Sequence, residues 1–283
     1  MPLSPARQVK DRVEDAAREA APWTERLARL GYAAKGVVYV VMGILAARAA
    51  AGRGGSVDGS EGAIAAILQQ PFGRVMVGAV AVGLFGYSLW RFVQAGLDPE
   101  RKGSDAKGIA QRIGYAISAV IHVGLALEAT RSVLRGFSTS DGGESAGDWT
   151  AMLMEQPFGA WVAGGIGAGI AAYGSYELYR AYTVRLDRRL ELGRMGPAAR
   201  VWVVRFSRFG LAARGVVFGV IGVLLVRAAL EHDPDDAVGL AGALRTLQQQ
   251  SYGPWLLGAV ALGLVGYGIY ELVRAKYRRV KAA

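Results

Sequence analysis

The chain has 283 residues, with 33 Lys and Arg against 23 Asp and Glu, no cysteine, and a mean hydropathy of +0.25. The lack of cysteine excludes disulfides, thiolate metal sites and thiol catalysis. The apolar residues form long blocks separated by charged loops, which is typical of membrane proteins rather than of soluble domains or nucleic-acid-binding proteins.

Residues 1–25 predict a cytosolic amphipathic helix, with Val9 and Val13 on one side and charged residues around them. The segment contains no apolar run, so it does not have the pattern of a signal peptide. Pro22 is expected to end this helix because proline lacks the backbone N–H that a helix interior needs. Trp23 and the arginines that follow it indicate an approach to the membrane interface.

Six apolar segments follow, each close to the roughly 20 residues that a helical crossing needs. The third is the weakest of them because it contains His122 and Glu128. The predicted fold is therefore all-α, a polytopic membrane helical bundle with transmembrane helices at about 32–50, 73–95, 113–134, 158–181, 210–230 and 254–276.

Basic residues gather in the N-terminal segment, after the second and fourth apolar segments, and at the C-terminus, whereas the other three loops are acidic or poor in Lys and Arg. The positive-inside rule then predicts a multi-pass protein of the bacterial cytoplasmic membrane with both termini in the cytoplasm. The expected partners are the bilayer, anionic headgroups on the cytoplasmic side and another membrane protein, and no nucleic acid.

The apolar segments repeat in pairs, so the unit is two spans and it occurs three times. The first span of each unit opens with Arg, an apolar residue and Gly, and the second follows a turn that begins with Gln and ends with Gly. Parallel copies of this kind are related by an axis along the membrane normal. The sequence thus predicts a pseudo-three-fold bundle of repeats 26–98, 107–183 and 207–283, the last with a basic C-terminal tail, joined by a cytoplasmic interfacial linker at 184–206 that breaks at Gly196 and Pro197.

Small residues at four-residue spacing on these spans let helix backbones approach closely in lipid. The same ridges carry charges and tyrosines in the inner half of the membrane, where a lone charge costs about 2.5–3.5 kcal/mol. We therefore expect Glu–Lys and Glu–Arg ion pairs with tyrosine hydroxyls as hydrogen-bond partners. The alternatives are plain packing seams and local pairs such as Glu177–Arg180 and Glu271–Arg274. The candidate intramembrane polar cluster comprises Lys35, Tyr87, Arg91, Ser118, His122, Tyr173, Glu177, Arg214, Tyr267 and Glu271.

Three glutamines recur at the outer turns, each after a short amphipathic segment. The pattern suggests either a short capping helix that lies on the outer face, with proline or serine opening the next span, or an amide ring for selectivity or gating around the pseudo-axis. The candidates are Gln70, Gln156 and Gln250. His122 could act as a proton relay or ligand, or it could simply hydrogen-bond inside the bundle. No catalytic, cofactor-binding or metal-binding motif is recognised in the sequence.

These repeated motifs resemble a bacterial membrane-protein family known only as domain of unknown function 1206. The motifs are Arg29-Leu30-Gly31-Tyr32-Ala33 with its two copies, and Gln70-Pro71-Phe72-Gly73 with its two copies. The resemblance covers about residues 25–280 and implies six spans in the cytoplasmic membrane, without an activity. The chain departs from the pattern at Ser118, where the other copies have Lys35 and Arg214, and at Ser251, which replaces a proline.

Two functions are compatible with this pattern, and an intramembrane enzyme would have only His122 and Glu128 in its favour. The first is a structural or accessory membrane protein that binds protein or lipid partners. The second is a transporter or channel for a small solute or ion that uses the pseudo-three-fold axis. A cavity on that axis favours transport, whereas a packed axis favours the accessory role.

Overall fold

The computed structural model describes residues 5–98, 103, 105–135, 146–183, 195–233 and 237–277. Within these ranges, the side chains are described for all residues except 5–25, 27, 107 and 146–149. The regular structure of these residues is helical. Each repeat is a long helix, a short helix and a second long helix. The long helices are α1 (Pro5–Ala50), α3 (Gly73–Gly96), α4 (Ala106–Arg135), α6 (Gly159–Thr183), α7 (Pro197–Glu231) and α9 (Gly253–Tyr277), and the short ones are α2 (Gly59–Leu68), α5 (Ala146–Met154) and α8 (Leu240–Gln248).

Five helices in the described part of the chain are long and apolar enough to cross a membrane: α3, α4, α7, α9 and the part of α1 from Ala28. The helix α4 is among them in spite of His122 and Glu128. The fourth expected span, α6, falls short of this hydropathy although it has 25 residues. Its many glycines, together with Glu177 and Arg180, lower its hydropathy.

Two expected helix boundaries were wrong. The helix α1 continues through Pro22 as one helix, because a proline can be tolerated inside a long helix at the cost of one backbone hydrogen bond. The expected break at Gly196 and Pro197 is present, since α7 begins at Pro197, but this helix does not end near residue 206 and runs unbroken to Glu231. The residues 184–194, the rest of the expected linker, lie outside the described part, as do the outer-loop residues 136–145.

The recurring turn between the short helix and the second long helix has a clear structural reason. The N–H of Gly73 donates to the carbonyl of Gln70 at 2.8 Å, and the equivalent glycines at 159 and 253 do the same to Gln156 and Gln250. A Cβ on Gly73 would collide with carbonyl oxygens of the preceding helix, so only glycine fits. The aromatic residue before Gly73, Phe72, is 84% exposed, as suits a residue at a membrane interface.

Within repeats 1 and 3, the two long helices pack backbone to backbone. A Cβ on Gly31 of α1 would overlap the backbone of Tyr87 on α3, and Gly210 of α7 stands in the same relation to Tyr267 on α9. Gly83 of α3 lies against Ala34 of α1, and a Cβ on Gly83 would be only 2.6 Å from the Cβ of Ala34. These seams are small-residue contacts of the kind that associate helices in lipid.

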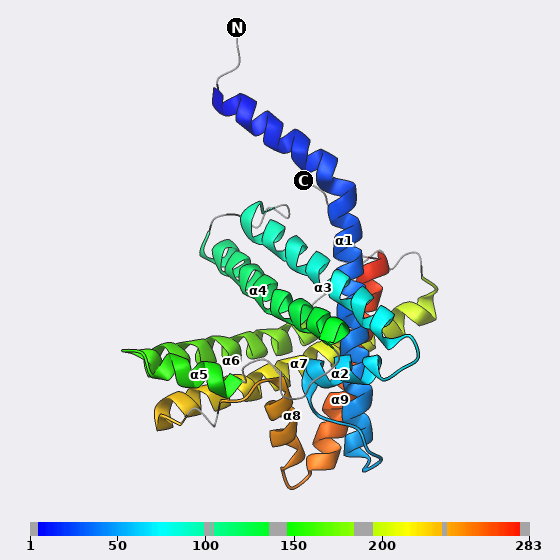
Figure 1. Ribbon diagram of the computed structural model, residues 1–283, viewed down its shortest axis with the longest axis vertical. Helices are drawn as coiled ribbons and strands as arrows, with labels where there is room; N and C mark the ends of the chain where they lie inside the picture. Colours follow the sequence, from blue (N-terminus) through cyan, green and yellow to red (C-terminus); the bar gives the residue numbers. More distant parts are fainter. Residues whose placement is uncertain are drawn as a thin grey trace.

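Between repeats, equivalent positions meet at all three interfaces. Gly36 of α1 faces Gly268 of α9, and Gly215 of α7 faces Gly174 of α6. At the third interface, Ser88 of α3 occupies the position of the even-helix glycine and donates through Oγ to the carbonyl of Ala119 on α4 at 2.9 Å. Figure 1 shows α1 and α9 upright and side by side, running in opposite directions.

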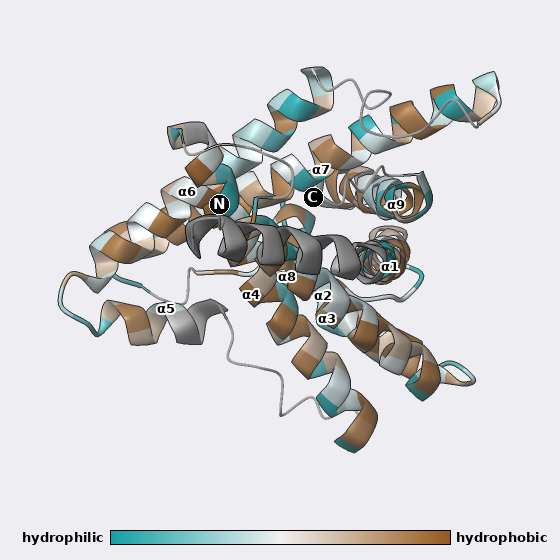
Figure 2. Cartoon of the chain, turned by 90° about the horizontal axis from the view of Figure 1, so that it is seen from above, coloured by the Kyte–Doolittle hydropathy of each residue, from teal (hydrophilic) through white to brown (hydrophobic). Residues whose placement is uncertain are grey.

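Repeat 2 lacks the internal seam that the other repeats have. Space is open beside Gly114 of α4 and beside Gly165 and Gly169 of α6. Ile117 stands at the position of Ala34 and Ala213, which contact a glycine of the even helix in the other repeats. The side chain of Ile117 is 57% exposed. The larger side chain leaves no room for the close approach, so α4 and α6 each pack on a neighbouring repeat instead. Figure 2 shows hydrophobic colouring along much of α3, α4 and α6 where they extend away from α1 and α9.

Two glycines on α7 provide a matched test of these seams. Gly222→Ala should lower the free energy of unfolding by about 1–3 kcal/mol, because its Cβ would press into the backbone of Gly167 and Ala171. Gly219→Ala, three residues earlier, meets open space and should be neutral or stabilising by roughly 0.5–1 kcal/mol. Denaturation in mixed micelles measures both changes, and equal effects of the two substitutions would contradict the packing seam.

Candidate functional site

The repeats place polar and aromatic side chains from all three copies at one level. On the odd helices α1, α4 and α7, these side chains lie four and eight residues after the glycine of the Arg-apolar-Gly motif. On the even helices α3, α6 and α9, they lie 14, 18 and 21 residues after the glycine that ends the turn. These fifteen side chains are called the polar layer: Lys35, Ser118 and Arg214; Tyr39, His122 and Phe218; Tyr87, Tyr173 and Tyr267; Arg91, Glu177 and Glu271; Gln94, Arg180 and Arg274.

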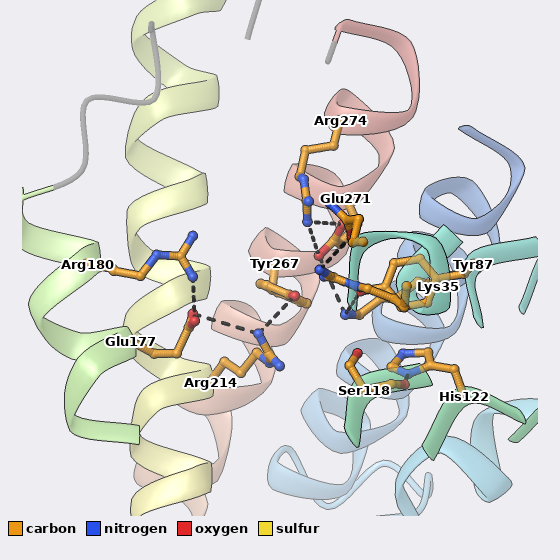
Figure 3. A network of polar contacts seen from close by, with 12 residues as sticks. Lys35, Tyr87, Ser118, His122, Glu177, Arg180, Arg214, Tyr267, Glu271 and Arg274 are labelled. Atoms are coloured by element: carbon orange, nitrogen blue, oxygen red, sulfur yellow. Dashed lines mark hydrogen bonds and ion pairs between the residues drawn. The ribbon is translucent and has the colours of Figure 1, made fainter. Parts of the chain in front are cut away.

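Two ion pairs join neighbouring repeats across this layer, as expected from the sequence. The Nζ of Lys35 on α1 lies 3.7 Å from Oε1 of Glu271 on α9. The Nη1 of Arg214 on α7 lies 3.7 Å from Oε2 of Glu177 on α6. Both glutamates have no exposed surface. These equivalent contacts link repeat 1 to repeat 3 and repeat 3 to repeat 2 (Figure 3).

Each buried glutamate also has a second cation on its own helix. Arg274 donates from Nη1 to both carboxylate oxygens of Glu271, at 2.9 and 2.8 Å, and Arg180 donates to Glu177 at 2.5 Å. The local pairs that the sequence offered as an alternative therefore coexist with the inter-repeat pairs. A carboxylate between two cations is less costly to bury, because the nearby charges and hydrogen bonds replace part of the lost water.

The cations also contact tyrosines within their own repeat. Lys35 donates to the hydroxyl of Tyr87 at 3.4 Å, and Arg214 donates to the hydroxyl of Tyr267 at 3.1 Å. Both cations further lie over aromatic rings, with the Nζ of Lys35 5.0 Å from the ring centroid of Tyr87 and the guanidinium of Arg214 4.8 Å from that of Phe218. Cation–π contacts strengthen as water is excluded, so they suit this buried layer.

An aromatic pair recurs at each of the three interfaces between repeats. The ring centroids of Tyr39 and Tyr267 are 4.7 Å apart, and those of Phe218 and Tyr173 are 5.4 Å apart. At the third interface, His122 takes this position and lies 4.5 Å from Tyr87. Edge-on and tilted pairs at these distances are favourable ring contacts. The three pairs therefore add a ring contact to each interface between repeats.

His122 therefore acts in the structure as a packed aromatic residue with one local hydrogen bond. Its Nδ1 lies 2.7 Å from the carbonyl oxygen of Ser118, one turn earlier on α4. Figure 3 shows the ring beside Tyr87, below Lys35. Among the described residues, no group of three His, Cys, Asp or Glu residues is arranged to hold a metal ion.

The interface between repeats 1 and 2 differs from the other two in charge. Arg91 of α3 stands where the other even helices have glutamates, and Ser118 of α4 stands where the other odd helices have cations. Arg91 donates to the Tyr87 hydroxyl from Nε at 2.8 Å and to Oε1 of Gln94 from Nη1 at 3.2 Å. Its guanidinium lies 4.9 Å from the ring centroid of Tyr115. The described residues thus give Arg91 neutral partners and no carboxylate.

The three outer glutamines are exposed, and two of them bond locally. Gln70 donates from Nε2 to the carbonyl of Ala66 at 3.4 Å, and Gln250 donates to that of Thr246 at 3.1 Å, each one turn back on its own short helix. These two contacts are local to each short helix, and both the capping helices on the outer face and the amide ring with Gln156 stay predictions. The importance of Gln94 and Tyr115 was missed in the sequence, because neither residue type recurs at that position in all three repeats.

A buried carboxylate can be compared with an exposed one. Glu271→Gln should cost roughly 3–5 kcal/mol of unfolding free energy, because Arg274 and Lys35 would then share no counter-charge. Glu231→Gln removes an exposed i, i+4 pair with Arg227, whose side chains are 48% and 58% exposed, and should cost about 0–1 kcal/mol. Denaturation in mixed micelles measures the difference, and a cost of less than about 1 kcal/mol for both would show that the polar layer adds nothing to stability.

Comparison with known proteins identifies the repeat. The sequence profile of the Domain of Unknown Function (DUF1206) matches residues 30–98, 113–184 and 209–278, three segments that each contain one odd and one even long helix. The chain is also 34% identical over 273 residues to a Bacillus subtilis (strain 168) protein called "Uncharacterized protein YxxB", covering 96% of this chain and 98% of that one. No solved structure matches. The resemblance drawn from the motifs is thereby confirmed, and the chain belongs to the DUF1206 family.

Proposed function

We propose that this protein is a non-enzymatic, structural or accessory protein of the bacterial cytoplasmic membrane that binds protein or lipid partners and has six spans in a pseudo-three-fold arrangement. The observation that carries the proposal is the packing of the polar layer. Its two glutamates have no exposed surface and each lies between two cations. Charged groups that are buried and paired with one another in this way lack the exposed, exchangeable contacts that a conduction pathway needs.

Repeat equivalence supports α6 as the sixth span. With 25 residues it extends roughly 37 Å at ~1.5 Å per residue, which exceeds the hydrocarbon thickness of about 30 Å. Its single acidic residue, Glu177, is neutralised by Arg180 and Arg214, so the hydropathy of the sequence overstates the cost of burying this helix. The contacts of α6 with α7 repeat those of α9 with α1.

The charge of the two ends supports the proposed orientation. At the end near the short helices, Arg245 of α8 pairs with Asp58 before α2 at 2.7 Å. Partial burial, with the carboxylates of Glu128 and Asp58 nearby, raises the pKa of Glu61 on α2. Acidic groups gather at this end, and the basic segments of the sequence lie at the other, as the positive-inside rule requires of the outer and cytoplasmic sides.

An excess of positive charge favours a second candidate, a transporter or channel for an anionic solute. The polar layer contains five cations and two carboxylates, the cations being Lys35, Arg91, Arg180, Arg214 and Arg274. Basic groups at membrane depth can mark the path of an anion. The three aromatic pairs occupy the same level, which favours the accessory role over this alternative.

The absence of native cysteine allows a direct test of topology. Single substitutions Asp105→Cys before α4 and Gly196→Cys after α6 should be labelled by a membrane-impermeant maleimide from the same side. Arg53→Cys in the loop after α1 should be labelled from the opposite side. Labelling of residues 105 and 196 from opposite sides would show that α6 does not cross and that the six-span arrangement is wrong.

Flux through reconstituted vesicles separates the two functions. Vesicles with the wild-type protein should release chloride, phosphate and potassium no faster than protein-free vesicles, because the polar layer is closed by its own contacts. The double variant Glu177→Gln/Glu271→Gln, first shown to be folded, is the comparison. Flux in the wild type that the double variant loses would replace the accessory role with the transporter.

A further inference from the structure

We infer that the interface between repeats 1 and 2 binds a phosphate group at Arg91, supplied by an anionic phospholipid or by free phosphate. The inference deepens the proposed function, on whose orientation and partner class it rests, by assigning the ligand chemistry and the residue that recognises it. The inference rests on Arg91, the cation of the polar layer for which the described residues provide no carboxylate partner.

The three interfaces show what is missing at this one. At two of them, a cation on an odd helix meets a glutamate on an even helix of another repeat, as in Lys35 with Glu271 and Arg214 with Glu177. At the third, the glutamate position holds Arg91 and the cation position holds Ser118. No described residue forms an ion pair with Arg91. A charge within the membrane is stabilised by a partner, and the described part of the chain supplies no carboxylate for Arg91, so an anion from outside the chain could take this place.

The neutral contacts of Arg91 hold its guanidinium in place without neutralising it. The Tyr87 hydroxyl accepts from Nε and from Nη2, and the Gln94 side chain accepts from Nη1. Lys35 donates to the same Tyr87 hydroxyl, so a second cation lies on the other side of this oxygen. An oriented guanidinium that retains N–H donors is suited to paired hydrogen bonds with the oxygens of a phosphate group.

The position of Arg91 along α3 is close to the boundary between the hydrocarbon layer and the lipid headgroups. It lies 18 residues after Gly73, or roughly 27 Å at ~1.5 Å per residue, near the far side of a hydrocarbon layer of about 30 Å. Arg112 of α4 lies close to the end of the same helix, where it donates to the carbonyls of Ala95 and Gly96 at 2.7 and 2.9 Å. Arg91 itself is half-buried, so part of its side chain remains accessible at this level.

The missing seam of repeat 2 offers a lateral route to this interface. In repeats 1 and 3, the odd and even helices of the repeat close against each other, but space remains open beside Gly114 on α4. The helix α4 carries both Ser118 and Tyr115, which belong to the Arg91 interface. A lipid can therefore approach α4 from the side that is covered in the other repeats.

The test compares the full-length wild type with a loss variant and a repaired variant. Arg91→Gln removes the charge, and Arg91→Glu/Ser118→Lys recreates the ion pair of the other two interfaces inside the chain. Arg227→Gln, at an exposed arginine of α7, is the matched control. Each protein is reconstituted into phosphatidylcholine vesicles with a minor fraction of phosphatidic acid, extracted, and analysed by native mass spectrometry for retained lipid. A second arm titrates inorganic phosphate into the protein in neutral detergent.

We expect saturable binding by wild type and Arg227→Gln, and about tenfold weaker binding by both Arg91 variants, since a hydrogen bond to a charged group is being lost. Retention of phosphatidic acid without binding of inorganic phosphate assigns the site to lipid, and binding of both assigns it to the phosphate group alone. If Arg91→Gln does not fold, the repaired variant still decides the outcome, because it restores an internal pair.

No saturable binding by the wild type in either arm would overturn the inference, as would equal binding by the wild type and the repaired variant. The failure of this inference is distinguishable from failure of the proposed function. Phosphate flux through wild-type vesicles would replace the accessory role while leaving binding at Arg91 intact. Absent flux together with absent binding would leave the accessory role without this ligand.

Discussion

A carboxylate held between two cations is the contact on which the rest of this structure depends. Glu177 and Glu271 each bind one arginine on their own helix and one cation on the next repeat. Removing such a pair from water is costly, and it is tolerated when geometry and additional hydrogen bonds are good. Because each glutamate joins two repeats, the same contact that satisfies its charge also fixes how the repeats are arranged around one another.

The glycine seams make that contact possible. The side chain of Lys35 can reach Glu271 because two glycines let the backbones of α1 and α9 touch: Gly36, one residue after Lys35, and Gly268, three residues before Glu271. A larger residue at either glycine would separate the helices, and the ion pair would open or admit water. Packing and electrostatics are therefore coupled, so a repeat can lose its polar contact through a change in side-chain size alone.

Much of the layer was predictable from sequence because repetition reveals equivalent positions. Four-residue spacing placed the tyrosines and charges on common ridges, and the cost of a lone buried charge predicted the partners of Lys35 and Arg214. Helix ends were less predictable: α1 passes Pro22, and α7 extends upstream to Pro197 as one helix. The asymmetry of repeat 2 was visible in Ser118, but its packing consequence followed only from Ile117, whose effect depends on the distance between two helices.

Three departures from the repeat pattern lie close together, and their position gives them a common meaning. Ile117 prevents the seam within repeat 2, while Ser118 and Arg91 replace the ion pair between repeats 1 and 2. A fully symmetric arrangement would satisfy all its charges and small-residue seams internally. The differences at α4 leave the interfaces of α1 with α9 and of α6 with α7 intact. The open space beside a helix and the arginine without a carboxylate partner among the described residues both lie at the interface between repeats 1 and 2. Repeat 2 therefore keeps its packed interface with repeat 3 through α6, while α4 carries the positions that differ from the other repeats.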